Sequence, residues 1–132
     1  MERMELMNPK FYVCKHCGNI IAYAKNTGVP VMCCGEKMVE LVPGATDGAK
    51  EKHVPVLEQD GDRVTVRVGS QAHPMGEDHS IEWILLHTTE GNQRKCLKAG
   101  GAPEASFRLS EGEKAVEALA YCNLHGLWAT KA

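Results

Sequence analysis

The sequence contains six cysteines and six histidines in 132 residues, and most of them fall into two groups. The early group has a CxxC turn at Cys14 and Cys17 and an adjacent pair at Cys33 and Cys34. A CxxC turn followed by a glycine, here Gly18, can point two thiolates at one metal while backbone N–H groups face the sulfur atoms. Four thiolates around one ion select zinc or iron. We therefore predict a four-cysteine metal site in this group.

Two other uses of the early cysteines stay open. A redox-active CxxC would leave Cys33 and Cys34 without a role. A disulfide is less compatible with a reducing compartment, and the cysteine content is below that of a disulfide scaffold.

Because neighbouring residues normally point their side chains apart, Cys33 and Cys34 are expected to share a metal only with a widened angle between the two metal–sulfur bonds. His16, inside the turn, is expected to be a solvated loop residue.

A second group of potential ligands lies later in the chain. Cys122 and His125 form a CxxH at a predicted turn, a spacing that lets a thiolate and an imidazole reach one metal. His73 and His79 are six residues apart, which is wrong for one helix face but suits a loop that wraps a metal. His53 lies next to a predicted strand. Each histidine alone would more often be a surface or core residue, but together these ligands suit iron with one octahedral position open.

The elements that position these ligands are predicted to be mostly β. Residues 63–68 alternate valine with polar residues, which is strand periodicity. A turn signal at 60–62 precedes them, so 54–57 and 63–68 are expected to form a hairpin. Spacing of this kind suggests a small sandwich or barrel. The further strands are expected at 80–86, 95–97 and 106–109.

The turn-rich segment 43–48 predicts a domain boundary. The piece before it, residues 1–42, is too small to fold on a hydrophobic core alone and needs a staple such as a metal. The piece after it, residues 43–132, is expected to carry the β-structure. Within this second piece, segment 111–121 has the composition of a helix, although its alternation also fits a strand.

Composition excludes several classes of protein. Hydrophobic residues make up 43% and charged residues 24%, which is the globular norm. The net charge of −2 argues against a nucleic-acid partner. No apolar run exceeds five residues, so we expect no membrane span. Residues 1–10 hold no apolar h-region, so we expect no signal peptide and a cytoplasmic location.

Taken together, six motifs resemble the desulfoferrodoxin family, the two-iron form of superoxide reductase. They are distributed over most of residues 11–130, in the same order along the chain, and no ligand position departs from the family pattern. The motifs are CKHCGN (14–19), CCGE (33–36), DGAKEKHVP (47–55), HPM (73–75) with His79, IEW (81–83) and YCNLHG (121–126).

The resemblance implies two iron ions per chain. A desulforedoxin-like domain, residues 1–42, would hold a rubredoxin-type iron on the four early cysteines. An immunoglobulin-like β-sandwich, residues 43–132, would hold a mononuclear iron, and residues 115–122 would be a strand rather than a helix. The implied ligands of this second iron are the equatorial His53, His73 and His79 through Nε2, the equatorial His125 through Nδ1, and the axial Cys122.

The activity that the resemblance implies is one-electron reduction of superoxide to hydrogen peroxide, with two protons taken up and no oxygen formed. Lys52, beside His53, would attract the anionic substrate. Glu51 resembles the family residue that occupies the sixth iron position after oxidation. The implied partners are superoxide, a rubredoxin-type electron donor and a second copy of the chain in a homodimer.

A different class of protein is also compatible with part of the sequence. A rubredoxin-like electron carrier or a zinc-stapled binding module would need only the first four cysteines, and Glu51 and Lys52 would then be a solvated ion pair. Neither alternative explains five potential ligands in the second piece. Cys96 lies outside both groups and is expected to be a free, partly buried thiol.

Overall fold

A computed structural model describes residues 9–46 and 48–132 of the chain. The chain divides into two compact units, Met1–Val42 and Pro43–Ala132. Residues 1–8, at the start of the expected first domain, and Asp47, in the expected boundary segment, lie outside the described residues. Within the described part of the chain, no helix combines the length and the hydrophobicity that a membrane crossing requires.

The first unit consists of a small antiparallel sheet and a two-stranded hairpin, whose strands lie between the second and third strands of the sheet in the sequence. The sheet order is β2–β1–β5, and the hairpin pairs β3 with β4. Among the described residues of this unit, only Phe11, Cys14 and Met38 are buried. So few buried side chains leave the unit short of a hydrophobic core, which agrees with the need for a metal staple. The strands are β1 (Phe11–Val13), β2 (Ile20–Ala22), β3 (Met32–Cys33), β4 (Glu36–Lys37) and β5 (Val39–Leu41).

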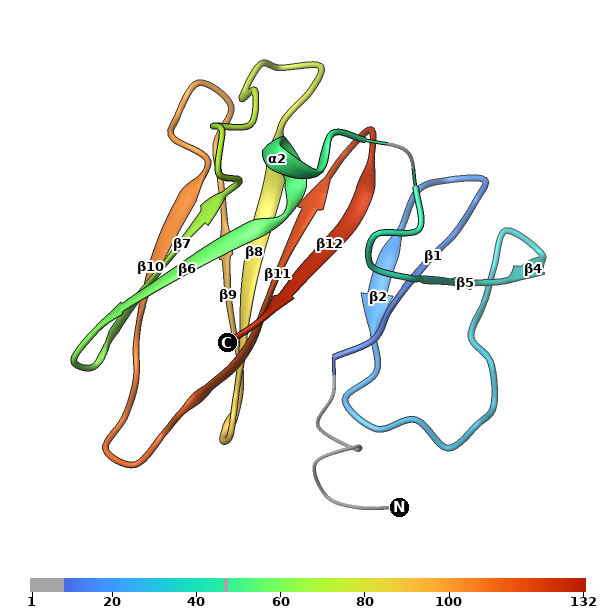
Figure 1. Ribbon diagram of the computed structural model, residues 1–132. Helices are drawn as coiled ribbons and strands as arrows, with labels where there is room; N and C mark the ends of the chain where they lie inside the picture. The colour runs from blue at the N-terminus through green and yellow to red at the C-terminus, as the bar shows by residue number, and fades with distance from the viewer. Residues whose placement is uncertain (1–8, 47) are drawn as a thin grey trace. The chain divides into compact units, whose positions relative to one another are not determined.

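The second unit is a β-sandwich of two antiparallel sheets (Figure 1). One sheet has the order β10–β7–β6 and the other β12–β11–β8–β9. A division of seven strands into three and four is also that of constant-type immunoglobulin domains. The strands are β6 (Pro55–Asp60), β7 (Arg63–Val68), β8 (Ile81–Thr88), β9 (Gly91–Cys96), β10 (Glu104–Arg108), β11 (Ala115–Cys122) and β12 (Gly126–Lys131).

The core of the sandwich is formed by alternate residues that point between the two sheets. In β7 the buried residues are Val64, Val66 and Val68, and they pack in one cluster with residues of β8, β10 and β11. The predicted hairpin is confirmed, because β6 pairs antiparallel with β7 across the turn at 61–62. The valine alternation therefore marks the face of β7 that is turned to the core.

Residues 115–121 of the segment with helical composition belong to a strand, β11. β11 lies between β8 and β12, and its register sets Ala118 opposite Leu86 and Ala120 opposite Ile84. The strand that the family resemblance implied is thus confirmed, and the helix that composition favoured is wrong. Neighbours on both sides give the β11 backbone hydrogen-bond partners, and its small alanines fit the packed interior, so tertiary context overrides the intrinsic propensity.

Three ligand-bearing segments meet at one end of the sandwich (Figure 1). The short helix α2 (Lys50–His53) directly precedes β6, and the loop 69–80 connects β7 to β8. The third segment is the turn between β11 and β12, which begins at Cys122. The topology of the sandwich therefore brings three segments that are distant in sequence to the same edge.

Candidate metal centres

The four early cysteines converge in the first unit. One sulfur atom from each of them lies within 4.8 Å of all the others. The Sγ atoms of Cys17 and Cys33 are 3.6 Å apart, and the backbone N–H of Cys17 donates to Cys14 Sγ at 3.4 Å. Gly18 has the positive φ, +83°, that the CxxC turn was expected to need. The geometry is that of a closed four-thiolate site.

The adjacent cysteines reach one point because the backbone turns between them. Cys34 has φ +52° and is the one non-glycine residue with a positive φ among those that the structure describes. The left-handed conformation costs roughly 1–2 kcal/mol for an ordinary residue. It removes the usual divergence of neighbouring side chains, so that Cys33 and Cys34 both face the cluster.

The neighbouring thiols of this cluster oppose the ionisation of Cys33 and Cys34 by raising their pKa values. Hydrogen bonding from the Cys17 backbone lowers the pKa of the Cys14 thiol to about 6. Interaction with the neighbouring thiols, first Cys14 and then Cys17, raises the pKa of Cys34 to about 12. Metal binding requires thiolates, and a cation among the four sulfurs would supply the charge that stabilises them together. The sulfur-only donor set fits a soft-ligand metal such as iron or zinc.

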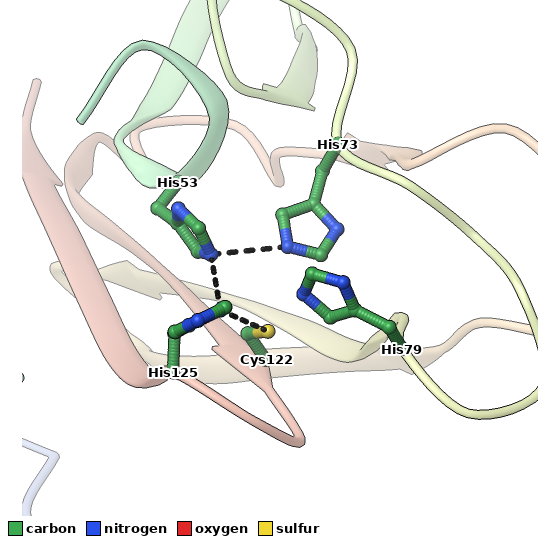
Figure 2. A group of neighbouring side chains, drawn as sticks. All are labelled: His53, His73, His79, Cys122 and His125. Carbon is green, nitrogen blue, oxygen red and sulfur yellow. Dashed lines mark hydrogen bonds between the residues drawn. The ribbon is translucent and has the colours of Figure 1, made fainter. Parts of the chain in front are cut away.

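The second group also converges, at the end of the sandwich described above. Its five members each offer one ligand atom, and these atoms all lie within 4.8 Å of one another. Figure 2 shows the four imidazole rings gathered around one point, with the sulfur atom beside them. Cys122, His53 and His73 are buried, with exposed fractions of 0%, 3% and 2%. The five members are His53, His73, His79, Cys122 and His125.

Backbone carbonyls fix which nitrogen of two rings faces this point. His53 Nδ1 lies 2.7 Å from the Ala49 carbonyl oxygen, and His73 Nδ1 lies 2.6 Å from that of Pro74. A ring nitrogen that donates to a carbonyl carries the hydrogen, so in a neutral imidazole the Nε2 atom keeps its lone pair. The two Nε2 atoms lie 3.1 Å apart. Two lone pairs that face each other at this distance fit a shared cation.

The remaining two histidines complete the set. His125 turns Nδ1 toward the cluster, 3.1 Å from His53 Nε2 and 3.7 Å from Cys122 Sγ. His79 Nε2 is a buried nitrogen with no hydrogen-bond partner in the described structure. A buried polar atom without a partner is costly unless a bound group satisfies it. A metal ion at the centre of the group would satisfy it.

Burial favours the uncharged form of two of the imidazoles, His73 and His79, and metal ligation requires neutral rings. Desolvation is the largest cause of a fall in the pKa of His73 to about 4, and it also lowers the pKa of His79. The positive charge of Lys52 adds to the lowering at His79, so Lys52 lies within electrostatic reach of the centre. Lys52 and Glu51 are both exposed on α2, next to the buried His53.

The other cysteine and histidines lie outside both groups. His16 is exposed and pairs with Glu36 at 3.1 Å. His87 is buried, and its Nδ1 lies 2.9 Å from Asn92 Oδ1. Cys96 is free but exposed, so the expectation of a partly buried thiol was wrong. Cys96 lies on β9, at the edge of its sheet, where one side of the strand has no strand neighbour among the described residues.

Sequence reasoning missed the groups that hold the ligands in place. The carbonyls of Ala49 and Pro74 orient two rings, and Thr46 and Trp128 both donate to the His125 carbonyl. Backbone carbonyls carry no sequence signal. Trp128 did offer one, since it is a large aromatic residue three positions after His125 in a chain with only two tryptophans.

Comparison with known proteins finds relatives over almost the whole chain. The family model described as Desulfoferrodoxin matches residues 45–131. The desulfoferrodoxin of Nitratidesulfovibrio vulgaris is 49% identical over 123 residues, covering 93% of this chain and 96% of that protein.

Solved structures give a matching result. The superoxide reductase of Treponema pallidum superposes with a TM-score of 0.79 at 40% identity, covering 94% of this chain and 99% of its own. The one-iron superoxide reductase of Giardia intestinalis superposes with a TM-score of 0.54 at 41% identity, covering 63% of this chain and 98% of its own. Because the family model matches residues 45–131 and a desulfoferrodoxin is 49% identical over 93% of the chain, this chain belongs to the desulfoferrodoxin family.

Proposed function

We propose that this chain is a superoxide reductase that converts superoxide and two protons to hydrogen peroxide with one electron. The observation that carries the proposal is the convergence of four imidazoles and one thiol at the end of the sandwich. Such a donor set suits an iron ion with a further coordination position available. Proteins of known structure that superpose on this chain bear the name superoxide reductase.

The ligands that we propose for the catalytic iron are His53, His73, His79 and His125, together with Cys122. When bound, the iron would supply the single electron that reduces superoxide. Burial favours the neutral form of His73, and backbone carbonyls orient the rings of His53 and His73. The side chain of Cys122 is fully buried, which removes it from contact with bulk solvent.

The residues proposed to act on the substrate are Lys52 and Glu51. Superoxide is an anion and the chain carries a net charge of −2, so attraction must be local. Lys52 is exposed on α2 and its charge is felt at His79, which supports a role in guiding superoxide to the centre. Glu51 is its exposed neighbour, and we propose that its carboxylate takes the open position once the substrate has reacted.

For the first unit, residues 1–42, we propose a rubredoxin-type iron on Cys14, Cys17, Cys33 and Cys34. Cys17 and Cys34 are exposed, which supports the approach of a small electron-transfer partner to this edge of the cluster. A rubredoxin-type protein is the proposed donor. The second unit, residues 43–132, is the proposed catalytic domain.

We further propose a homodimer and a location in the cytoplasm. Among the exposed large hydrophobic residues, Val29, Val31, Met32, Val39 and Val42 belong to the first unit. Apolar side chains exposed in this number support self-association. The four early cysteines converge on one point without forming disulfides, which supports a reducing compartment. Sedimentation equilibrium of the holoprotein tests the dimer.

The experiment that tests the enzyme is metal analysis combined with anaerobic mixing of the reduced protein with superoxide. Two irons per chain and stoichiometric oxidation of the second centre by superoxide, with peroxide but no oxygen formed, are expected. Cys17→Ser should leave one iron per chain and preserve the reaction. One iron or one zinc on the early cysteines, with no reaction, would identify the chain as an electron carrier or a zinc-stapled module.

A further inference from the structure

Trp128 contacts two of the ligand-bearing segments at once. It lies on β12 and is buried, with an exposed fraction of 4%. Its indole Nε1–H donates to the His125 carbonyl oxygen at 3.0 Å. Its ring packs against the imidazole of His53, with the ring centroids 5.0 Å apart and the planes inclined by 32°. One side chain therefore links the β11–β12 turn to helix α2.

The space around the indole is closed by a glycine. A Cβ atom at Gly48 would lie 3.1 Å from Trp128 Cζ2 and 3.2 Å from His53 Cε1. These distances are tighter than nearly all contacts of real Cβ atoms, so a larger residue would push on both rings. The neighbouring Ala49 carbonyl accepts the hydrogen of His53 Nδ1. The imidazole of His53 is thus held on its face by Trp128 and at its edge by Ala49.

The carbonyl of His125 is held by a second donor, the Oγ1 hydroxyl of Thr46. A carbonyl oxygen has two lone pairs, and here Trp128 and Thr46 use both. The residues Cys122 and Gly126 are paired across the turn, and Ala120 lies opposite Trp128. The turn that carries both Cys122 and His125 is therefore fixed by its strand register and by two donors to one carbonyl.

We propose that Trp128 is a positioning residue for the iron centre, which sets the His125 turn through its N–H and the plane of the His53 ring through its face. The proposal rests on the proposed function in that it takes His53, His125 and Cys122 as iron ligands. Outer groups that orient ligands typically change metal affinity 10–100-fold when they are removed. Trp128 should accordingly influence the iron–thiolate bond without touching the metal.

The first variant for the test is Trp128→Phe, which keeps an aromatic ring and removes the N–H donor. In the oxidised, iron-loaded protein we expect a shift of the thiolate-to-iron(III) charge-transfer band, a changed electron paramagnetic resonance spectrum of the second centre, and about tenfold faster iron release to a chelator. The matched control is Trp83→Phe. Trp83 lies on β8 and stacks on Tyr121 with centroids 5.6 Å apart, and its replacement should leave the parental spectra.

Two further variants keep the proposal testable if Trp128→Phe does not fold. Thr46→Val removes the other donor to the His125 carbonyl and should shift the same band. Gly48→Ala should disturb both rings and speed iron release. Parental spectra and parental iron release in Trp128→Phe, or in both further variants, would overturn the proposal. None of these readouts uses superoxide, so an iron centre that responds in this way but does not react with superoxide would contradict only the proposed function.

Discussion

The Nε2 atoms of His53 and His73 lie 3.1 Å apart, although the two residues are 20 positions apart in the chain. His53 ends helix α2, and His73 lies in the loop between β7 and β8. Each ring donates a hydrogen bond from Nδ1 to a backbone carbonyl. The two Nε2 atoms therefore present their lone pairs to the same point. Two backbone carbonyls thus select the ligand atoms of these histidines, as groups that accept the other ring N–H of a ligating histidine commonly do.

Replacing Cys122 with serine tests the thiolate ligand. Cys122 is fully buried and its Sγ lies 3.7 Å from His125 Nδ1. We expect Cys122→Ser to lose the thiolate-to-iron(III) charge-transfer band of the second centre, because a hydroxyl does not supply the sulfur donor. Visible absorption of the oxidised protein measures it. Cys96→Ser, at an exposed cysteine outside both clusters, is the control and should keep the band. Retention of the band in Cys122→Ser would remove Cys122 from the ligand set.

Neutralising Lys52 tests local attraction of the substrate. We expect Lys52→Gln to slow the association of superoxide by about tenfold at low ionic strength and to weaken the salt dependence of the rate, because one positive charge near the centre is lost. Pulse radiolysis at low and high salt measures both. Lys114→Gln is the matched control, because Lys114 directly precedes β11, whose other end carries Cys122. Equal rates for Lys52→Gln and the parent at both salt concentrations would exclude the steering role.

Adding a methyl group at Gly69 tests how the loop after β7 supports α2. A Cβ atom there would meet the backbone carbonyl oxygen of Glu51 at 2.7 Å and that of Val54 at 3.0 Å. Backbone atoms cannot swing aside as a flexible side chain can, so Gly69→Ala should displace α2 and with it His53.

We expect Gly69→Ala to lower the iron content of the second centre and to leave the four-cysteine centre loaded, as measured by metal analysis and visible spectra. Gly76→Ala is the control in the same loop, because the nearest atom to its Cβ would be the His79 carbonyl oxygen at 3.9 Å. Full iron content in Gly69→Ala would show that α2 tolerates the displacement.

Replacing Thr88 with valine tests a partly buried hydrogen bond at the other end of β8. Thr88 Oγ1 donates to Glu113 Oε2 at 2.5 Å and is the largest cause of a pKa of Glu113 below its ordinary value of 4.5. A carboxyl with a depressed pKa stabilises the folded state above its unfolded pKa, and this contribution is lost as the pH falls through the folded pKa.

Thr88→Val should therefore reduce the free energy of unfolding by about 1 kcal/mol at pH 7. The difference from the parent should shrink below about pH 4.5, where Glu113 is protonated in the unfolded chain. Urea denaturation across this pH range measures it. Thr65→Val is the control, since the hydrogen-bond partner of Thr65 Oγ1 is a neutral group, Ser106 Oγ at 3.2 Å. A difference that is constant with pH would contradict the role of Glu113.

The sequence predicted the β-structure well where one face of a strand is buried. The valines of β7 alternate because every second residue of this strand faces the core, and this pattern is visible without the structure. β11 was ambiguous, because the composition of residues 111–121 favours a helix while the strand is imposed by pairing with β8 and β12. Pairing partners that are distant in sequence are not encoded in local propensity.

By itself, the sequence determined which residue types are available for chemistry and how they are grouped. The CxxC and CxxH spacings are local, and a turn of a few residues is enough to aim two ligands at one point. Tertiary structure decided what spacing cannot express. The positive φ of Cys34 lets adjacent cysteines converge, and the end of the sandwich gathers five ligands from three separate segments. The contact of Trp128 with His53 exists only because packing joins groups that are far apart along the chain, whereas the hydrogen bond of Trp128 to the His125 carbonyl spans only three residues.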